Sequence, residues 1–509
     1  MSPIILNRHT TEECIGFWYK TFWMTLLGVM FFVFYGMSGY FVSHYIKDAP
    51  SIFLDFESYM PFWEWLITPY MSSDIIFIVV FYCCTTRLEM LNLVKRTTVA
   101  VLVATLFFVL LPLKFSFAKP EVINPYNSFW FELLTSNDTI YNQAPSLHVC
   151  YAVIFYSVLK DHTKGIMKAI TGIWCFLIGI STIFVYQHHV IDLFSAGILM
   201  SLVFLLFPQG LKRSQRVGIF FLLISNILAT LAILLIVFTD NSLWYVLFSG
   251  SLSLLSVGLC YIYNKPSLLK LWNVNIWRKQ LRRSKNLNCN AFVSLGLYLL
   301  NILKLIINWP YYLGQFINWF FFAKKDEHLK VEVSYLSKGS IRKLKAHNAS
   351  IEICKLDDES EALKNTTNIS KNITILVGAR LHKKGYQALT KGSQLYVLDL
   401  SAELQENYWC SRNCNCNSYP ILDLVEHTSE ELVDISNELD LIVDSLKDGD
   451  VLYIHCMLGK SRSFLVALLC LIKFKNMTFE EAKCNILSNS KNAFLPNYLF
   501  SDVLEIKQI

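Results

Sequence analysis

Eight long apolar runs occupy the first half of the chain and restrict what it can fold into. They lie near residues 22–44, 63–85, 98–117, 146–160, 166–185, 189–207, 217–238 and 243–263. Most can cross the roughly 30 Å hydrocarbon core of a bilayer as a helix, whereas the fourth is short and begins with polar residues. The chain is 54% hydrophobic and only 17% charged. We therefore expect an all-α, polytopic membrane domain of about eight spans over residues 1–265.

Basic residues between these runs predict the orientation. The connections near 86–97, 160–168 and 208–216 each carry three Lys or Arg, whereas those near 45–62 and 239–243 lean acidic. Lys and Arg favour the cytoplasmic side, so the loops after the first, third, fifth and seventh spans are expected to face outward. No cleavable signal peptide is apparent, and the first span is expected to act as the targeting signal. We expect an integral, multi-pass protein of a bacterial cell membrane.

Two polar elements fall on the expected outward side. Residues 145–148 read Pro-Ser-Leu-His at the start of the fourth span, and Ser181 is followed by His188 and Asp192 at the fifth-to-sixth turn. Ionisable side chains at membrane depth are costly and suggest function. On a helix, Asp192 could orient the His188 imidazole for attack on phosphorus, while His148 protonates the departing oxygen. The alternative is that these histidines only cap helix ends.

This pattern resembles the type 2 phosphatidic acid phosphatase superfamily, which combines Pro-Ser-x-His with Ser-Arg, five residues, His, three residues, Asp. The resemblance spans roughly residues 60–210. It implies a phosphohistidine at His188, polarised by Asp192, with His148 as the acid for the leaving group. Ser146 and Ser181 are the implied phosphate ligands.

Two departures from the family pattern leave the reaction open. Thr182 stands where the commonest form has Arg, and the upstream Lys, six residues, Arg-Pro element is reduced to Lys114 with Lys119-Pro120. Lys119 is the phosphate ligand expected from that element. Thr182 is similar to the branch containing inositol phosphorylceramide synthases, where the phosphoryl acceptor can be an alcohol. Both hydrolysis and transfer therefore remain predictions.

A second motif lies near the C-terminus. Residues 455–463 read His-Cys-Met-Leu-Gly-Lys-Ser-Arg-Ser, between an apolar strand at 451–455 and an apolar helix. The N–H groups and dipole at a helix N-terminus suit a dianionic phosphate and favour a thiolate at Cys456. Arg462 can add a planar, bidentate fork to phosphate oxygens. Asp423 is the expected general acid. The alternative is a buried structural cysteine.

These residues resemble the dual-specificity branch of the Cys-dependent protein phosphatases, whose motif reads His-Cys, five residues, Arg, then Ser or Thr. The likeness covers about residues 374–509 and implies an α/β fold there. It implies a phosphocysteine at Cys456, and Asp423 acting as acid and then base. Phosphate is expected to be held by Arg462, and its release assisted by Ser463.

Two further loop residues are expected phosphate ligands. Gly459 lies in the phosphate-binding loop, and Lys460 follows it. Some lipid-directed members of the cysteine family carry Lys or Arg at the position of Lys460. A solvated loop lysine is the alternative.

Turn and capping signals predict the elements of this domain. Strands are expected at 374–378 and 395–400, and a helix is expected through the apolar positions of 432–446. Capping boxes are expected from Thr428 to Glu431 and from Thr478 to Glu481.

Residues 266–373 connect the two halves. Seven Lys and Arg between 265 and 285, with no acidic residue, favour anionic lipid. The apolar stretch 291–323, broken by Asn308-Trp309-Pro310, is expected to form a hairpin or interfacial segment within a juxtamembrane region 266–330. A single crossing is the alternative, and it would place the C-terminal domain outside. Residues 331–373 are expected to be a linker or lead-in.

Cysteine usage favours a cytoplasmic C-terminal domain. The 14 cysteines show no disulfide framework, and Cys456 must stay reduced. Cys410, Cys414 and Cys416 cluster before the Asp423 strand, but no histidine at ligand spacing supports a metal site. We expect neither a metal nor a cofactor.

From both resemblances we expect a bifunctional integral membrane phosphatase that removes phosphate monoesters from phospholipids or isoprenoid phosphates. Anionic membrane lipids are expected partners, and nucleic acid is not. One alternative is a lipid phosphotransferase. The other is a membrane-anchored phosphatase that acts on Tyr, Ser or Thr of phosphoproteins.

Overall fold

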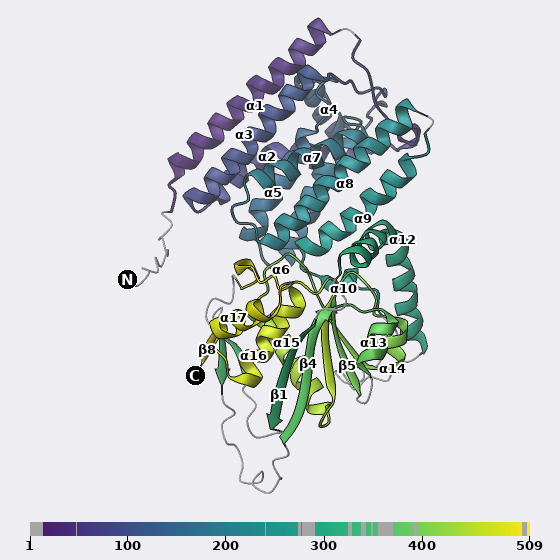
Figure 1. Cartoon of the computed structure of the whole chain (residues 1–509). Coiled ribbons are helices and arrows are strands. Elements are labelled where there is room, and N and C mark those ends of the chain that lie inside the picture. The colour runs from purple at the N-terminus through teal and green to yellow at the C-terminus, as the bar shows by residue number, and fades with distance from the viewer. Residues whose placement is uncertain are drawn as a thin grey trace. The chain divides into compact units, whose positions relative to one another are not determined.

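The chain divides into two compact units, which are described separately (Figure 1). Unit 1 comprises Met1–Leu211 and Ile219–Leu255, and unit 2 comprises Lys212–Gly218 and Ser256–Ile509. The computed structural model describes residues 14–46, 48–239, 241–272, 276, 291–323, 328–336, 343–347, 350–354, 370–390, 394–500 and 506–508.

The N-terminal part is helical. Its helices are α1 (Phe17–Tyr45), α2 (Ile67–Cys83), α3 (Arg87–Leu110), α4 (Pro125–Asn137), α5 (Leu147–His162), α6 (Gly165–Phe184), α7 (Val190–Leu206), α8 (Arg213–Phe238) and α9 (Trp244–Ile262). Each expected apolar run contains a helix. Within the part of the chain that the structure describes, six are long and apolar enough to cross a membrane, namely α1, α2 with the turn before it, α3, α6, α8 and α9. The apolar α7 is shorter, and α5 has only 16 residues.

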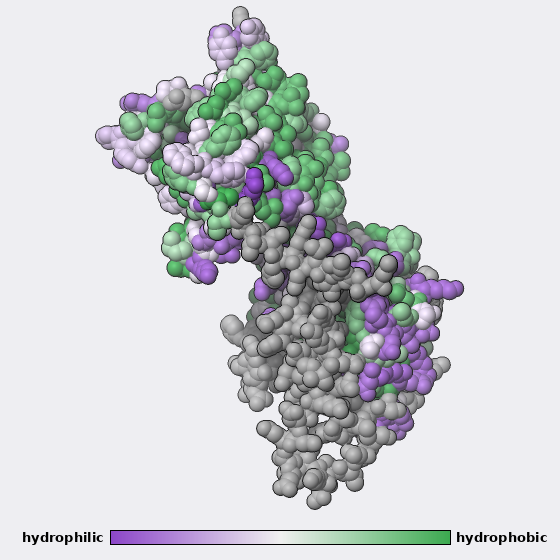
Figure 2. Space-filling view, turned by 90° about the vertical axis from the view of Figure 1, so that its left-hand side faces the viewer, coloured by the Kyte–Doolittle hydropathy of each residue, from purple (hydrophilic) through white to green (hydrophobic). Residues whose placement is uncertain are grey.

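The helix surfaces are apolar, as a lipid environment requires. Hydrophobic residues cover much of the face of this unit drawn in Figure 2. On α1 alone, Trp18 is 81% exposed, Phe32 73% and Met37 65%. Exposed apolar surface of this extent in a soluble protein would promote association, whereas in a bilayer it meets acyl chains. These helices are therefore compatible with a multi-pass membrane protein.

The third span begins earlier than expected. α3 starts at Arg87, and the Oγ1 of its N-cap residue Thr86 accepts from the backbone N–H of Glu89 at 3.2 Å. The basic stretch 86–97 is thus the start of this helix, and it is not a loop. Arg96 is satisfied there because it donates to the carbonyls of Phe207 and Gln209.

The C-terminal unit is built on a mixed five-stranded sheet. Its strands, in spatial order, are β1 (Leu329–Leu336), β4 (Ser370–Ala379), β7 (Val451–Cys456), β5 (Leu395–Ser401) and β6 (Asn415–Ile421). β1 runs antiparallel to β4, and the other neighbours are parallel. The carboxyl ends of the parallel strands therefore meet at one edge, where α/β proteins place ligands.

Helices cover both faces of this sheet. One face carries α15 (Ser429–Ser445), α16 (Arg462–Lys475) and α17 (Phe479–Asn489), whose apolar residues join the main core. The other face packs against α13 (Lys383–Leu389) and α14 (Tyr408–Asn413). A small second sheet has the order β2 (Lys343–His347), β3 (Ser350–Cys354) and β8 (Ile506–Gln508).

Local signals located β4, β5, β7, α15 and α16, whereas the small second sheet, α13 and α14 were not expected. β1 also belongs to the main sheet, so the sheet begins at Leu329, at the border of the expected juxtamembrane region and lead-in, and not at residue 374. The Thr478 capping box is complete. The Thr428 box is half formed, because the Glu431 carboxylate contacts the His427 imidazole instead, at 3.0 Å.

The segment before the sheet contains α10 (Pro266–Leu269) and α12 (Ala291–Phe322). α12 is helical on both sides of a kink at Asn308. Pro310 lacks the N–H that would bond to the preceding turn, which explains the break. The apolar stretch therefore forms a kinked helix, and whether it lies at the membrane surface or crosses the membrane stays a prediction. Most of the expected basic run lies outside the described residues.

Candidate active sites

The loop between β7 and α16 has the geometry of an anion site. β7 ends at Cys456 and α16 begins at Arg462, so the loop leads into a helix N-terminus. The N–H groups and dipole at that terminus favour a negative charge. Cys456 is 2% exposed, and its Sγ lies 3.6 Å from the Oγ of Ser463. Thiol and hydroxyl therefore lie together at the start of the helix.

Gly459 lets this loop pass close to the end of β4. Its φ is +68°, which is unfavourable for residues with a Cβ. A Cβ at this position would lie 2.4 Å from the backbone nitrogen of Ala379. The glycine is therefore required both by backbone conformation and by space.

We expect Gly459→Ala to destabilise the protein by about 2–5 kcal/mol, because left-handed strain and overpacking add. Gly449→Ala is the matched control. Gly449 has φ +79° but no atom within 4 Å of an added Cβ, so only the strain applies, about 1–2 kcal/mol. Thermal unfolding and phosphate release measure the effects. Equal stability and activity in the two variants would contradict the role of the loop.

Arg462 presents one edge of its guanidinium for an anion. Its Nη1 donates to both carboxylate oxygens of Glu403 at 2.9 Å and to the Ile421 carbonyl at 3.1 Å. The Nη2 lies 3.5 Å from the Asp423 carboxylate. Among the described residues, the buried Nε has no hydrogen-bond partner. The Nε and Nη2 edge can therefore take two phosphate oxygens. Sequence reasoning missed Glu403, which lies just after β5.

Asp423 lies beside Arg462 but is ionised in this arrangement. It follows β6, and its Oδ1 accepts from the Ser461 hydroxyl at 2.9 Å. Burial alone would raise the pKa of Asp423, but the Arg462 guanidinium and the Ser461 hydroxyl outweigh it and hold the pKa below its usual value. To act as an acid, Asp423 must first lose its pairing with Arg462.

Lys460 is less closely tied to the site. Its side chain is exposed, and its carbonyl accepts from the Phe494 N–H at 2.7 Å. The structure thus groups Cys456, Gly459, Arg462, Ser463 and Asp423, and leaves the Lys460 side chain in solvent.

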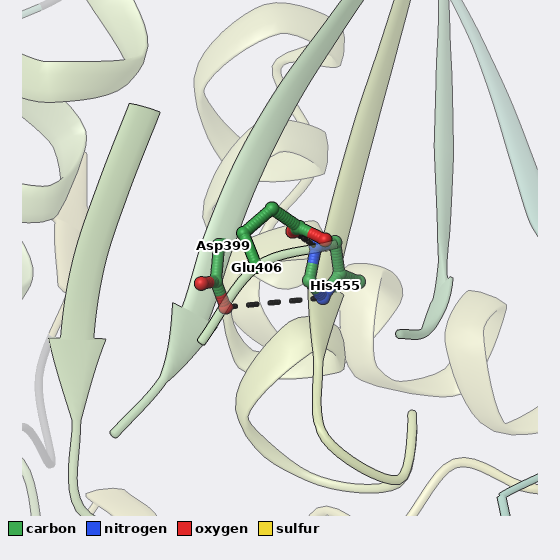
Figure 3. Close-up of side chains that lie close together, drawn as sticks. All are labelled: Asp399, Glu406 and His455. Carbon is green, nitrogen blue, oxygen red and sulfur yellow. Dashed lines mark hydrogen bonds and ion pairs between the residues drawn. The ribbon is translucent and has the colours of Figure 1, made fainter. Parts of the chain in front are cut away.

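A buried charged cluster surrounds His455, the residue that precedes the cysteine (Figure 3). The His455 Nε2 lies 2.6 Å from Glu406, and its Nδ1 lies 3.9 Å from Asp399. The Tyr386 hydroxyl donates to Glu406 at 3.0 Å. Burial disfavours the imidazolium, but the two carboxylates outweigh it and raise the pKa of His455 above its ordinary value. No pattern in the sequence points to Glu406 or Asp399.

In the helical unit, His188 and Asp192 lie together. The Nδ1 of His188 is 3.2 Å from the Oδ2 of Asp192, and both side chains are buried. His188 is not on the helix as expected, because α7 begins at Val190 with His189 as its N-cap. The same Asp192 oxygen accepts from the His189 N–H at 3.0 Å. The carboxylate therefore both caps the helix and orients the His188 imidazole.

The Pro-Ser-x-His element joins this pair. The Ser146 N–H donates to the Asp192 carbonyl at 3.2 Å. The Ser146 hydroxyl is buried and has no hydrogen-bond partner among the described residues. His148 stacks on Tyr70 with ring centroids 4.0 Å apart, and it interacts electrostatically with His188. Both histidines and an unsatisfied hydroxyl thus occupy one region.

The other expected phosphate ligands differ from one another. The Ser181 hydroxyl donates to the Ile178 carbonyl within α6, so it is already engaged. Lys119 and His188 both interact electrostatically with Asp138, a residue that sequence reasoning missed. Burial lowers the pKa of Lys119, partly opposed by Asp138. Lys119 and His188 therefore share Asp138 as an interaction partner, whereas the Ser181 hydroxyl bonds within its own helix.

His189 has a structural role. Its Nδ1 lies 3.0 Å from Glu57, and its Nε2 lies within 3.3 Å of the hydroxyls of Ser51 and Ser116. Phe115 stacks on the ring at 4.5 Å. Both ring nitrogens are therefore engaged in contacts within the protein.

The cysteine cluster contains a close pair. The Sγ atoms of Cys410 and Cys416 lie 3.1 Å apart and are buried. Among the described residues, the cysteines belong to no group with the spacing of metal ligands.

No protein-family model matches the chain, and no curated protein matches it. Among solved structures, the "Crystal structure of Tk-PTP in the active form" is 19% identical over 26% of this chain and 87% of that one, with a TM-score of 0.22. A putative protein tyrosine phosphatase from Leishmania major is 17% identical over 27% of this chain and 89% of that one, with a TM-score of 0.21. These neighbours match a small part of the chain, and the function is inferred from the residues of the two sites.

Proposed function

We propose that this chain is a multi-pass membrane phosphatase that hydrolyses phosphate monoesters of lipids at two metal-independent centres. The observation that carries the proposal is the partly unpaired state of the buried Arg462 guanidinium. Glu403 accepts hydrogen bonds from the Nη1 of Arg462, while the buried Nε has no partner among the described residues. Arg462 is the first residue of the helix that follows the Cys456 loop. A dianionic phosphate supplies the acceptors that this edge lacks.

At the C-terminal centre, the Cys456 thiolate is the proposed nucleophile. It attacks phosphorus, the bond from phosphorus to the leaving oxygen breaks, and Asp423 gives that oxygen a proton. Asp423 then takes a proton from the water that attacks the phosphocysteine, and the Ser463 hydroxyl donates to the departing thiolate. A bound phosphate competes with Asp423 for Arg462, which raises the pKa of the Asp423 carboxyl so that it can carry the proton.

Asp423→Asn tests this acid through the leaving group. We expect phosphate release from an alkyl phosphate to fall about 10²–10⁴-fold, because an alkoxide cannot depart without a proton. Release from p-nitrophenyl phosphate should fall much less, since nitrophenolate is a stable anion. The ratio of the two rates in wild type and variant is the measurement. An equal loss for both substrates would exclude Asp423 as the acid.

At the membrane centre, His188 is the proposed nucleophile and His148 the acid. Because Asp192 contacts the Nδ1 of His188, the Nε2 lone pair is left for phosphorus. Ser146 and Lys119 are the proposed phosphate ligands. Water, or an alcohol in the transferase alternative, then takes the phosphoryl group from His188 and restores the imidazole.

A substrate panel tests the proposal in detergent micelles. Phosphate release is measured from phosphatidic acid, an isoprenoid phosphate and a phosphotyrosine peptide, with wild type, His188→Ala and Cys456→Ser. Lipid turnover that is lost in one variant and kept in the other would assign each substrate to a centre. Phosphate found on an added alcohol would support the transferase. Peptide turnover alone, abolished by Cys456→Ser, would support a membrane-anchored protein phosphatase.

We also propose that the membrane centre faces outward and that the C-terminal centre is cytoplasmic, in a bacterial cell membrane. The positions of basic connections support this orientation. Cys484, which is exposed on α17, is the suitable probe. Its reaction with a membrane-impermeant thiol reagent in intact cells would refute a cytoplasmic C-terminal domain.

A further inference from the structure

A lysine that precedes the sheet domain is buried in the turn after β5. Lys270 follows α10 and is 2% exposed. Its Nζ donates to the Asp399 carboxylate at 2.5 Å and to the carbonyls of Ser401 and Leu404 at 2.6 and 2.8 Å. An ammonium group has three donors, and all three are used here. Lys270 therefore ties the end of β5 to the residues that follow it, within the turn 399–406.

That turn carries the carboxylates that hold two neighbours of the nucleophile. Both carboxylate oxygens of Glu403 accept from the Nη1 of Arg462, at 2.9 Å. Glu406 lies 2.6 Å from the Nε2 of His455, the residue before the cysteine. Residues 402–406 lie beyond Ser401, the last residue of β5 that pairs with β6, so side-chain contacts such as those of Lys270 help to determine the shape of this segment.

The backbone around Lys270 is fastened to α12. The Lys304 Nζ donates to the carbonyls of Ser267 and Lys270, both at 2.9 Å. The Tyr312 hydroxyl donates to the Leu269 carbonyl at 2.6 Å. A continuous set of hydrogen bonds therefore runs from α12 through Lys270 to the turn that positions Arg462.

The positive charge beside Asp399 comes from Lys270, so a metal ion is not needed there. Asp399, Glu406 and His455 offer ligand atoms within 4.8 Å of one another, a spacing that a metal ion could use (Figure 3). The Lys270 ammonium already forms an ion pair with the Asp399 carboxylate, and His455 pairs with Glu406. A divalent ion would have to displace the ammonium. Loss of Lys270 would leave a buried carboxylate uncompensated.

We propose that Lys270 is a positioning residue of the Cys456 centre, which shapes the turn 399–406 so that Glu403 can orient Arg462 for phosphate. The inference rests on the proposed phosphatase function of that centre. It extends that function because it makes the segment before α12, as well as the sheet domain, part of the catalytic unit.

The test measures phosphate binding apart from turnover. The solubilised chain is treated with iodoacetate, and alkylation of Cys456 is followed by mass spectrometry at increasing concentrations of inorganic phosphate. In wild type, phosphate should protect the thiol. In Lys270→Met, the phosphate concentration needed for protection and the KM for a phosphomonoester should both rise about 10–100-fold, because Arg462 is misoriented. Lys447→Met removes an exposed lysine between α15 and β7 and should leave both values unchanged.

Two further variants separate positioning from stability. If Lys270→Met does not fold, Lys270→Met with Asp399→Asn removes the uncompensated carboxylate and should fold with the same weak phosphate binding. Glu403→Gln combined with Lys270→Met should be no worse than the more severe single variant, since both act through Arg462.

Each outcome decides between the claims. A folded Lys270→Met protein with wild-type phosphate protection and KM would refute the positioning role while leaving the phosphatase function intact. Effects of Lys270→Met and Glu403→Gln that multiply would also refute it. A wild-type chain that shows neither phosphate protection nor phosphate release would overturn both the function and this inference.

Discussion

Cys456→Ser is expected to lower phosphate release at the C-terminal centre by about 10⁴-fold or more. A serine hydroxyl at neutral pH is a much weaker nucleophile toward phosphorus than a cysteine sulfur. The substitution removes the nucleophile but leaves the Nε and Nη2 edge of Arg462 in place. Phosphate binding should therefore survive while turnover is lost. Initial rates and inhibition by inorganic phosphate, measured on the same preparation, separate the two effects.

Cys484→Ser is the matched control, because Cys484 is exposed on α17, away from the loop between β7 and α16. It should keep the wild-type rate. The activity that His188→Ala retains belongs to the C-terminal centre. If Cys456→Ser keeps more than a small fraction of this activity, the assignment of the nucleophile is wrong.

His188→Ala should lower turnover at the membrane centre by about 10³-fold or more. The imidazole is the group expected to form a bond to phosphorus. Its Nδ1 lies 3.2 Å from the Oδ2 of Asp192, which orients the ring. Asp192→Asn is also expected to lower turnover strongly, because the amide can donate to Nδ1 and hold the wrong tautomer of His188. Lipid phosphate release by the Cys456→Ser protein, which isolates this centre, is the measurement.

A histidine outside the cluster provides the control. His162 pairs with Glu89 at 2.8 Å and is partly exposed, so His162→Ala should keep the rate. His189→Ala should instead unfold at a lower temperature, because it leaves the buried Glu57 without its imidazole partner. Turnover that is unaffected by His188→Ala would remove the membrane centre from the account.

Local patterns predicted the elements around both sites, because the relevant signals are contiguous in sequence. The strand and helix that flank Cys456 follow from apolar runs, and the loop between them follows from its length and Gly459. Glu403 and Lys270 could not be found this way. Their partners Arg462 and Asp399 are far along the chain, and only the sheet order β7-β5-β6 brings them together. Charged residues on irregular turns give no periodic signal.

The errors in the helical unit have a different cause. Hydropathy marks the apolar centre of a helix and not its ends, so α3 extends through the basic residues before residue 98. The Thr86 cap marks its true start. His188 was assigned to a helix from its spacing to Asp192, but the carboxylate caps α7 and orients the imidazole from the turn before it. The same spacing is compatible with both arrangements.

Trapping of labelled phosphate on the protein tests the central claim most directly. The chain is mixed with a ³²P-labelled lipid phosphate, quenched rapidly under alkaline and acidic conditions, and digested for mass spectrometry. Two centres predict an acid-labile label on the His188 peptide that is absent in His188→Ala. They also predict a thiophosphate label on the Cys456 peptide that is absent in Cys456→Ser. Phosphate release without label at either residue would contradict the account of two covalent phosphate-transfer centres in one chain.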